Sequence, residues 1–362
     1  MKVASVDIQH VVVPLAKPAG FALGQIASFG CLLVTIRSDD GVTGESLIFT
    51  INNVRARVLA EMVESLKPLV IGTDPAMTND FWTKAWRGIN FIGHKGVSIM
   101  GISAIDSALW DLNAKAAGLP LYRMLGGAQT RLPAYHSGGL WLSQSIDDLV
   151  AEAGDMVASG FTAIKMRLGA PTAAEDLARA RAIRTAIGPN IKFMADGNQG
   201  FTENEAIKRG RMLEEIDLTW YEEPLPAWDI EGLARVRAAV PMPIASGETE
   251  YTRYGFRQML EARCADVLMP DLQRAGGVTE FMRMSRMAEA FDVAISSHLF
   301  SEMSIQLLGA LSNVVFLEYM PWFKDLYAES LVFEDGDALV PERPGFGFTF
   351  NQDYVSFLAN KS

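Results

Sequence analysis

The chain has 362 residues, of which 49% are hydrophobic and 21% are charged. This length exceeds the needs of one small core and suits a large barrel with an added domain. The formal net charge of −11, from 43 acidic and 32 basic residues, argues against nucleic acid or an anionic membrane as a partner.

The cysteine content and the lengths of the apolar runs indicate the cellular compartment of the protein. Cys31 and Cys264 are the only cysteines, so neither a disulfide framework nor a zinc cluster is expected from them. The first residues lack the features of a secretion signal, and no apolar run reaches membrane-spanning length. We therefore expect a cytoplasmic protein.

The first third of the chain predicts a separate α+β unit. Residues 3–13 and 31–37 alternate or run apolar, and SDDGVTG at 38–44 leads into another extended stretch, which predicts an antiparallel meander. Helical periodicity over residues 53–70 and 97–117 predicts two helices after these strands.

From about residue 129 onward, short apolar strands alternate with amphipathic helices. Eight strands are predicted, near residues 133–137, 162–167, 192–196, 218–222, 242–247, 265–269, 292–297 and 314–318. This alternation predicts an α/β fold, a (β/α) barrel whose loops after the strands carry the chemistry. Residues from about 326 onward are rich in Gly and Pro, and we expect them to return to the N-terminal unit.

Three carboxylates recur at one interval in the barrel region. Asp196, Glu222 and Glu248 each follow a predicted strand and stand 26 residues apart. One strand plus one helix has about this length, so the three acids are expected at the same height on neighbouring strand ends. A single acid there is more often a helix N-cap or a surface charge, but three hard oxygen ligands in phase predict a divalent cation, with Mg²⁺ favoured.

Two cations end the second predicted barrel strand. Lys165 and Arg167 are two residues apart on one face, so both are expected to point into the barrel mouth toward the acids. Isolated basic residues at strand ends are mostly solvated or paired with surface acids. Facing the acids, the lysine is a candidate base with a lowered pKa, whereas the arginine is expected to bind a carboxylate or phosphate.

The later predicted strands end in an acid, a histidine and a second acid. Asp271 and His298 predict a pair in which the carboxylate fixes the imidazole tautomer, as a general base or acid requires. Glu318 is either a buried acid paired with a cation or, if protonated, a donor to a substrate oxygen. His94 and His136, in Gly-flanked loops, are weaker candidates for substrate contact, and surface placement fits them equally well.

These residues together resemble the enolase superfamily, in its mandelate racemase subgroup, over essentially the whole chain. The resemblance rests on KMR at 165–167, DGN at 196–198, EEP at 222–224, GE at 247–248, PD at 270–271, SSHLF at 296–300, LE at 317–318 and the helix containing SALWDLNAKAAGLPL. It implies a (β/α)₇β modified TIM barrel over residues 129–325. It also implies an N-terminal α+β capping domain over residues 1–128, completed by residues 326–362.

The resemblance also implies a partial reaction. Mg²⁺ is expected on the three acids, and the proton α to a carboxylate is removed to give an enediolate. By position, Lys165 resembles the residue that neutralises a carboxylate oxygen, Glu318 the acid that hydrogen-bonds the other oxygen, and Asn198 a further polar contact. His298 with Asp271 resembles the base that serves one face of the α-carbon.

Arg167 departs from the family pattern KxK, in which a second lysine serves the opposite face. Arginine, with an ordinary pKa above about 12, is a poor base near neutral pH, so one-base chemistry is favoured. His298 would then remove the α-proton and protonate a departing β-hydroxyl. We therefore expect dehydration of an acid sugar to a 2-keto-3-deoxy acid.

The predicted flap at residues 17–30 favours other substrates, because it is largely apolar. A racemase or epimerase of a 2-hydroxy acid or an amino-acid derivative is the alternative, and a lactone cycloisomerase needs the same single base. A non-catalytic binder is disfavoured, because a binder needs no metal facing an acid–base pair. The expected partner is a small carboxylate substrate, and barrels of this kind commonly form homo-oligomers.

Overall fold

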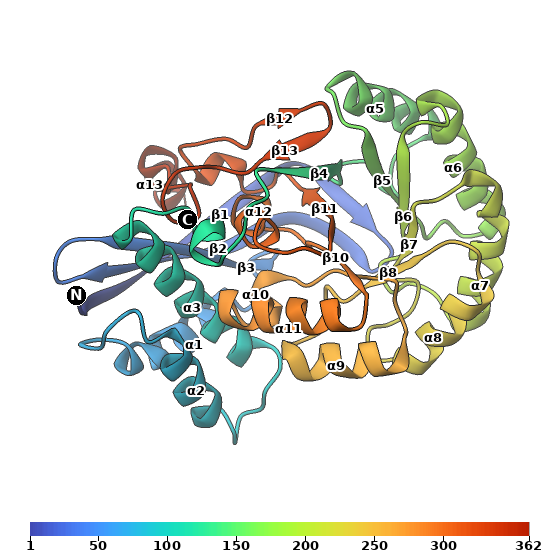
Figure 1. Cartoon of the computed structure of the whole chain (residues 1–362). Helices are drawn as coiled ribbons and strands as arrows, with labels where there is room; N and C mark the ends of the chain where they lie inside the picture. Colours follow the sequence, from blue (N-terminus) through green and yellow to red (C-terminus); the bar gives the residue numbers. More distant parts are fainter. Residues whose placement is uncertain (362) are drawn as a thin grey trace.

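The computed structural model describes residues 1–361, with a long N-terminal sheet and its helices beside a closed barrel (Figure 1). The N-terminal unit contains β1 (Val3–Phe21), β2 (Gly24–Ser38), β3 (Thr43–Ile51), α1 (Ala56–Leu66), η1 (Lys67–Leu69), α2 (Thr78–Gly88), α3 (Val97–Ala116) and α4 (Leu121–Met124). The strands form an antiparallel sheet in the order β1-β2-β3. The predicted meander is therefore confirmed. Helix α2 was not predicted.

Helix α3 lies between this sheet and the barrel, and it is buried on almost every side. Gly44 on β3 allows the close approach, since a Cβ at this position would lie 2.0 Å from the Ala108 carbonyl oxygen. On the other side of the helix, Ser103 Oγ donates to the Leu272 carbonyl at 2.9 Å. Asp106 accepts hydrogen bonds from the Thr279 amide at 2.8 Å and hydroxyl at 2.6 Å. These hydrogen bonds fix the N-terminal unit to the segment that follows the sixth barrel strand, β9 (Val267–Leu268).

Eight parallel strands form the barrel. They are β4 (Arg131–His136), β5 (Ala163–Arg167), β6 (Lys192–Asp196), β7 (Trp220–Glu222), β8 (Ile244–Ser246), β9 (Val267–Leu268), β10 (Ala294–Ser296) and β11 (Val314–Tyr319). Each strand pairs with the next, and β11 pairs with β4, which closes the ring. All eight predicted strands are confirmed, and the buried interior of the barrel is filled by side chains such as Tyr135, Met194 and Trp220.

Helices follow the first seven barrel strands. They are α5 (Ile146–Ala158), α6 (Ala173–Ile187), α7 (Glu203–Met212) with η2 (Glu214–Ile216), α8 (Ile230–Ala239), α9 (Thr252–Ala262), α10 (Leu272–Ala275) with α11 (Val278–Ala290), and α12 (Ser301–Leu308). Helix α6 begins with a capping box, in which the Thr172 hydroxyl accepts from the Glu175 amide and the Glu175 carboxylate accepts from the Thr172 amide. The eighth strand is not followed by such a helix, so the barrel is of the predicted (β/α)₇β type.

The chain after the barrel contacts both units. It contains η3 (Lys324–Leu326), β12 (Phe333–Glu334), β13 (Asp337–Leu339) and α13 (Gln352–Ala359). Strand β13 pairs antiparallel with β4 of the barrel. The Phe346 amide donates to Asp111 Oδ1 at 2.7 Å, and the Phe350 amide donates to Glu45 Oε2 at 3.1 Å, so later residues reach the N-terminal unit. None of the helices within residues 1–361 is long and apolar enough to cross a membrane.

Candidate active site

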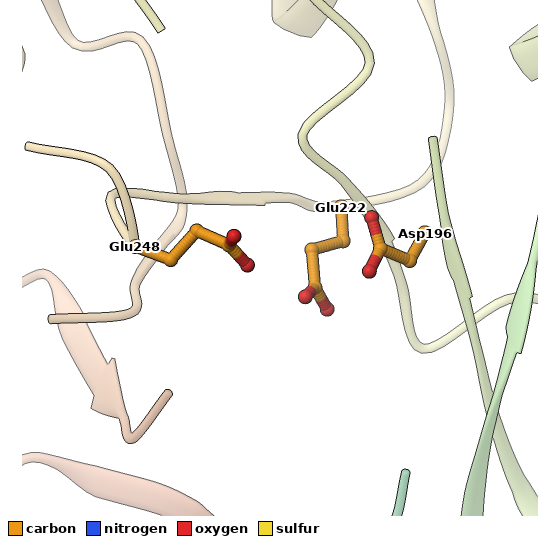
Figure 2. Close-up of side chains that lie close together, drawn as sticks. All are labelled: Asp196, Glu222 and Glu248. Carbon is orange, nitrogen blue, oxygen red and sulfur yellow. The ribbon is translucent and has the colours of Figure 1, made fainter. Parts of the chain in front are cut away.

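Three carboxylates converge at the carboxyl ends of β6, β7 and β8. Asp196 and Glu222 are the last residues of their strands and are paired in register, and Glu248 lies two residues beyond β8. One carboxylate oxygen from each lies within 4.8 Å of the others. Figure 2 shows the three side chains pointing toward one another. The parallel register thus brings together the three acids that stand at equal intervals in the sequence.

This acidic cluster has the character of a site for a hard divalent cation. Burial raises the pKa of Glu222 to about 8; Lys165 opposes the shift, and the charge of Asp196 adds to it. Trp220 Nε1 donates to Glu222 Oε2 at 2.9 Å and holds this carboxylate in place. Three carboxylates at this spacing supply the oxygen ligands that Mg²⁺ prefers, and a bound cation would offset their mutual repulsion. The residues present therefore fit a magnesium ion.

Lys165 is buried within the acidic cluster. Its Nζ pairs with Glu222 and lies 3.0 Å from Glu318 Oε1 and 3.6 Å from Asp196 Oδ2. Burial alone would lower the pKa of Lys165, but the three carboxylates outweigh it and raise the pKa above the ordinary value. The structure therefore differs from the expectation of a lowered pKa, because more acids face the amine than its position on the strand indicated. In this arrangement Lys165 is a fixed cation.

Arg167 lies beside the cluster, on the same face of β5. Its Nε is 3.4 Å from Asp196 Oδ2, and its Nη2 donates to Ser137 Oγ at 3.1 Å. The guanidinium carbon lies 4.6 Å from the centre of the Trp141 ring, a cation–π contact. Arg167 is thus held on three sides.

His298 and Asp271 form the predicted pair. His298 Nδ1 lies 2.8 Å from Asp271 Oδ2, and Nε2 lies 3.3 Å from Glu248 Oε2. Because a carboxylate only accepts hydrogen bonds, the Nδ1 atom that faces Asp271 carries a proton, and Nε2 is the nitrogen directed toward Glu248 and the pocket. Burial opposes the charged imidazolium, but Glu248 and the hydrogen bond to Asp271 raise the pKa of His298 above its ordinary value.

The backbone is strained directly after His298. Leu299 and Phe300 both have φ of +49°, a left-handed conformation that is unfavourable for bulky side chains and that clusters at functional sites. In this conformation the Leu299 amide donates to Glu318 Oε2 at 2.7 Å. Burial alone would raise the pKa of Glu318, but Lys165 and His298 outweigh it and lower the pKa to about 2. Glu318 is thus paired with a cation, which is the first of the two alternatives considered above.

Asn198 lines the pocket, whereas His94 and His136 do not. The Asn198 amide and Nδ2 donate to the two oxygens of Asp196 at 2.7 and 2.9 Å. His94 stacks on Trp86 in the N-terminal unit, with ring centres 3.9 Å apart. His136 packs edge-on against Phe161, with its ring outside the barrel, and burial lowers its pKa to about 4. Neither histidine lines the pocket over the acids. His94 lies between α2 and α3 in the N-terminal unit. His136 is the last residue of β4 and not a loop residue, and its side chain points away from the barrel interior because successive strand residues alternate in direction.

Apolar side chains and one further cation complete the pocket. The apolar lining comes from the β1–β2 hairpin, from β3 and from the loops after β4, β10 and β11: Phe21, Ile26, Phe49, Ile51, Trp141, Leu299, Met320 and Trp322. The apolar hairpin tip is thus the predicted flap. Arg274, absent from the sequence prediction, also lines the pocket, and its Nη1 donates to the Glu248 carbonyl at 2.8 Å. Its position three residues after Asp271, which caps α10, was the available signal.

Two family models match the chain. The N-terminal domain of mandelate racemase / muconate lactonizing enzyme matches residues 3–126, and the enolase C-terminal domain-like family matches residues 148–354. The chain belongs to the mandelate racemase/muconate lactonizing enzyme family of the enolase superfamily. The predicted resemblance is confirmed.

Relatives with similar sequences and structures are named for, or were solved with, different small acids. The chain is 32% identical to an L-talarate/galactarate dehydratase of Salmonella typhimurium over 96% of this chain and 88% of the relative. The L-talarate dehydratase of Polaromonas sp. JS666, solved with Mg and L-glucarate, is 30% identical with a TM-score of 0.92, covering 99% and 97% of the two chains. An enolase from Bradyrhizobium, solved with magnesium and mandelic acid, is 31% identical with a TM-score of 0.92, covering 99% and 98%.

Proposed function

We propose that this protein is a Mg²⁺-dependent enzyme that removes the proton α to a carboxylate and dehydrates an acid sugar to a 2-keto-3-deoxy acid. The observation that carries the proposal is the position of the single imidazole, His298, at the edge of the acidic cluster, with Nε2 3.3 Å from Glu248. A base is thereby placed next to the site where a substrate carboxylate would be bound. The family and the dehydratases among the relatives support the same reaction.

Asp196, Glu222 and Glu248 are the residues that would hold the metal. When bound, Mg²⁺ supplies positive charge to the substrate carboxylate, whose oxygens gain negative charge when the α-proton leaves. Lys165, a buried cation among three carboxylates, is placed to neutralise one of these oxygens.

His298 performs both proton transfers in this proposal. Its Nε2 lone pair takes the α-proton, and Asp271 stabilises the imidazolium that forms. The electrons of the C–H bond first move into the carboxylate to give an enediolate, and they then form the C=C bond between the α- and β-carbons as the C–O bond of the β-hydroxyl breaks. The imidazolium returns its proton to the departing hydroxyl, which leaves as water, and the resulting enol tautomerises to the 2-keto-3-deoxy acid.

Glu318 acts through its fixed position. Lys165 and His298 lower the pKa of Glu318, so in this proposal its carboxylate balances the positive charge of these groups beside the substrate. The amide of Leu299 keeps Oε2 in place.

A second candidate follows from the apolar lining. Side chains such as Phe21, Ile51 and Trp322 suit a 2-hydroxy acid with an apolar substituent, and the Bradyrhizobium relative was solved with mandelic acid. Such a substrate has no β-hydroxyl to lose, so the reaction would stop at proton exchange or inversion of the α-carbon.

A substrate screen in deuterated water separates the two candidates. The enzyme is loaded with Mg²⁺ and offered five- and six-carbon aldonic and aldaric acids, and aryl- and alkyl-substituted 2-hydroxy acids. We expect keto-acid formation from an acid sugar, without deuterium in the remaining substrate. Deuterium exchange with inversion of a 2-hydroxy acid, and no keto acid from any sugar, would replace dehydration by epimerisation.

A further inference from the structure

The guanidinium of Arg167 is only partly satisfied by the protein. Nε lies beside Asp196, Nη2 donates to Ser137, and the flat face stacks on Trp141. Nη1 is buried and has no hydrogen-bond acceptor anywhere in residues 1–361, although Arg167 is only 4% exposed and lines the pocket. A buried charged donor without an acceptor is costly, so the pocket is built to receive an acceptor from elsewhere.

A second unpaired group belongs to Asn198, which also contacts Asp196. Asn198 Nδ2 donates to Asp196 Oδ2, the oxygen that also faces Arg167 Nε. Because a carboxylate only accepts, Nδ2 must be the atom that faces it, and Oδ1 is therefore turned away. Oδ1 is buried and has no donor within the described chain. The pocket thus holds an unpaired donor and an unpaired acceptor, both next to Asp196.

A hydroxyl group matches this combination better than a second carboxylate does. A hydroxyl both accepts and donates hydrogen bonds, whereas a carboxylate only accepts and would leave Asn198 Oδ1 unpaired. We propose that Arg167 is a specificity-determining residue that donates through Nη1 to a substrate hydroxyl beside the carboxylate, and that it is not a second base. The inference rests on the proposed function for the position of the substrate over the acidic cluster.

The barrel places this contact away from the base. Strand β5, which carries Arg167, and β10, which precedes His298, are separated by β4 and β11 on the shorter way around the closed ring. A substrate held over the acids therefore meets His298 on one side and Arg167 on another. Because Arg167 binds rather than accepts a proton, only one face of the α-carbon is served, and the configuration of the adjacent hydroxyl is selected.

Binding measurements test the hydroxyl contact without any need for turnover. The probes are five- and six-carbon aldonic acids and their 2-deoxy and 3-deoxy analogues, titrated calorimetrically into the Mg²⁺-loaded protein and into the Arg167→Met variant. We expect the protein to bind at least one aldonic acid about 10- to 100-fold more tightly than its deoxy analogue. The variant should lose this discrimination while binding the deoxy analogue with similar affinity.

Three results bear on the proposal, and two overturn it. Equal discrimination by the Arg167→Met variant shows that another group reads the hydroxyl. Failure of the Mg²⁺-loaded protein to bind any of these probes removes the hydroxyl as the missing acceptor. Binding with hydroxyl discrimination but without keto-acid formation supports the Arg167 contact and counts against dehydration instead. Different results therefore contradict the inference about Arg167 and the proposed dehydration.

Deuterium exchange tests the absence of a second base even if the Arg167 variant does not fold. In the His298→Asn variant, Arg167 and Lys165 on β5 are intact and are the remaining candidate bases. We expect no exchange of the α-proton of either epimer of a 2-hydroxy acid or aldonic acid that the protein binds. Exchange confined to one epimer in this variant would show that a second base serves the other face of the α-carbon, and the inference that only one face is served would be wrong.

Discussion

The floor of the pocket consists of charged side chains at the ends of barrel strands, whereas its lid consists of apolar side chains from the β1–β2 hairpin and β3. In the floor, Lys165 has three carboxylate partners and His298 has two. In the lid, Ile26 and Phe49 belong to the apolar core that continues into the barrel, with residues such as Ile164. The lid is linked to the floor by the Phe49 amide, which donates to Gln273 Oε1 at 2.9 Å, next to Arg274.

The difference shows how one barrel separates reaction from selectivity. Charges buried together fix each other's position, and their removal leaves partners unpaired, so the floor tolerates little change. Each apolar contact in the lid adds a small amount to the free energy of substrate binding. Substitutions in the lid can therefore change the substrate preference in small steps. Changes in the floor are therefore expected to act on turnover or on metal binding, and changes in the lid on KM.

The largest effect is expected for His298→Asn. Loss of the base should lower kcat by about 10³- to 10⁴-fold, while the acidic cluster stays intact and Mg²⁺ affinity changes little. Steady-state kinetics on the substrate found in the screen and calorimetric titration of Mg²⁺ measure the two quantities. His94→Asn is the matched control, because His94 lies outside the pocket, and it should keep kcat within about twofold. Turnover retained in His298→Asn would move the base to Lys165.

Glu248→Gln tests the metal cluster. Replacing one of three carboxylates removes a charge and a ligand, so Mg²⁺ affinity should fall by at least about 100-fold, more than the loss of an outer-shell partner causes. Calorimetric titration of Mg²⁺ measures this directly. Glu250→Gln, in the same loop but paired with Lys95, serves as the control and should bind Mg²⁺ nearly as the unchanged protein does. Equal affinities in the two variants would contradict the proposed ligand set.

Asp271→Asn is expected to change both the rate and its pH dependence. The base must be neutral, and the pKa of His298 is raised, so kcat/KM should rise with pH through a pKa above 6.5. The variant removes a charge and a hydrogen bond that raise this pKa, so its rise should begin at lower pH. Its plateau should be lower by about 100-fold, because the tautomer is no longer fixed. A pH–rate profile with an unchanged midpoint would show that Asp271 does not act on the base.

The floor was more predictable from the sequence than the lid or the outlying histidines. Spacing alone placed Asp196, Glu222 and Glu248 together, because parallel strands of equal repeat length end at one height. The same rule placed His298 near Asp271. His136 was misplaced because it lies one residue from the inward-facing Tyr135, and a shift of one residue reverses the face of a strand.

Other features depend on conformations that the sequence did not reveal. Leu299 and Phe300 are left-handed although neither residue type favours this region, so the hydrogen bond from Leu299 to Glu318 had no local signal. The charge state of Lys165 depends on three acids from different strands, whose distances arise only on folding. All residues of helix α12 are buried, so it has no amphipathic period of the kind that predicts a helix between two barrel strands.

The smallest effect is expected in the lid, for Ile51→Ala. Ile51 lines the pocket but is 38% exposed, so the fold should tolerate the change. Loss of its contact should raise KM by about fourfold for each substrate methylene that it touches, with kcat almost unchanged. Val58→Ala, on the exposed face of α1 and away from the pocket, should leave KM as it was. A fall in kcat with constant KM would show instead that the lid takes part in the chemical step, and the division between floor and lid would not hold.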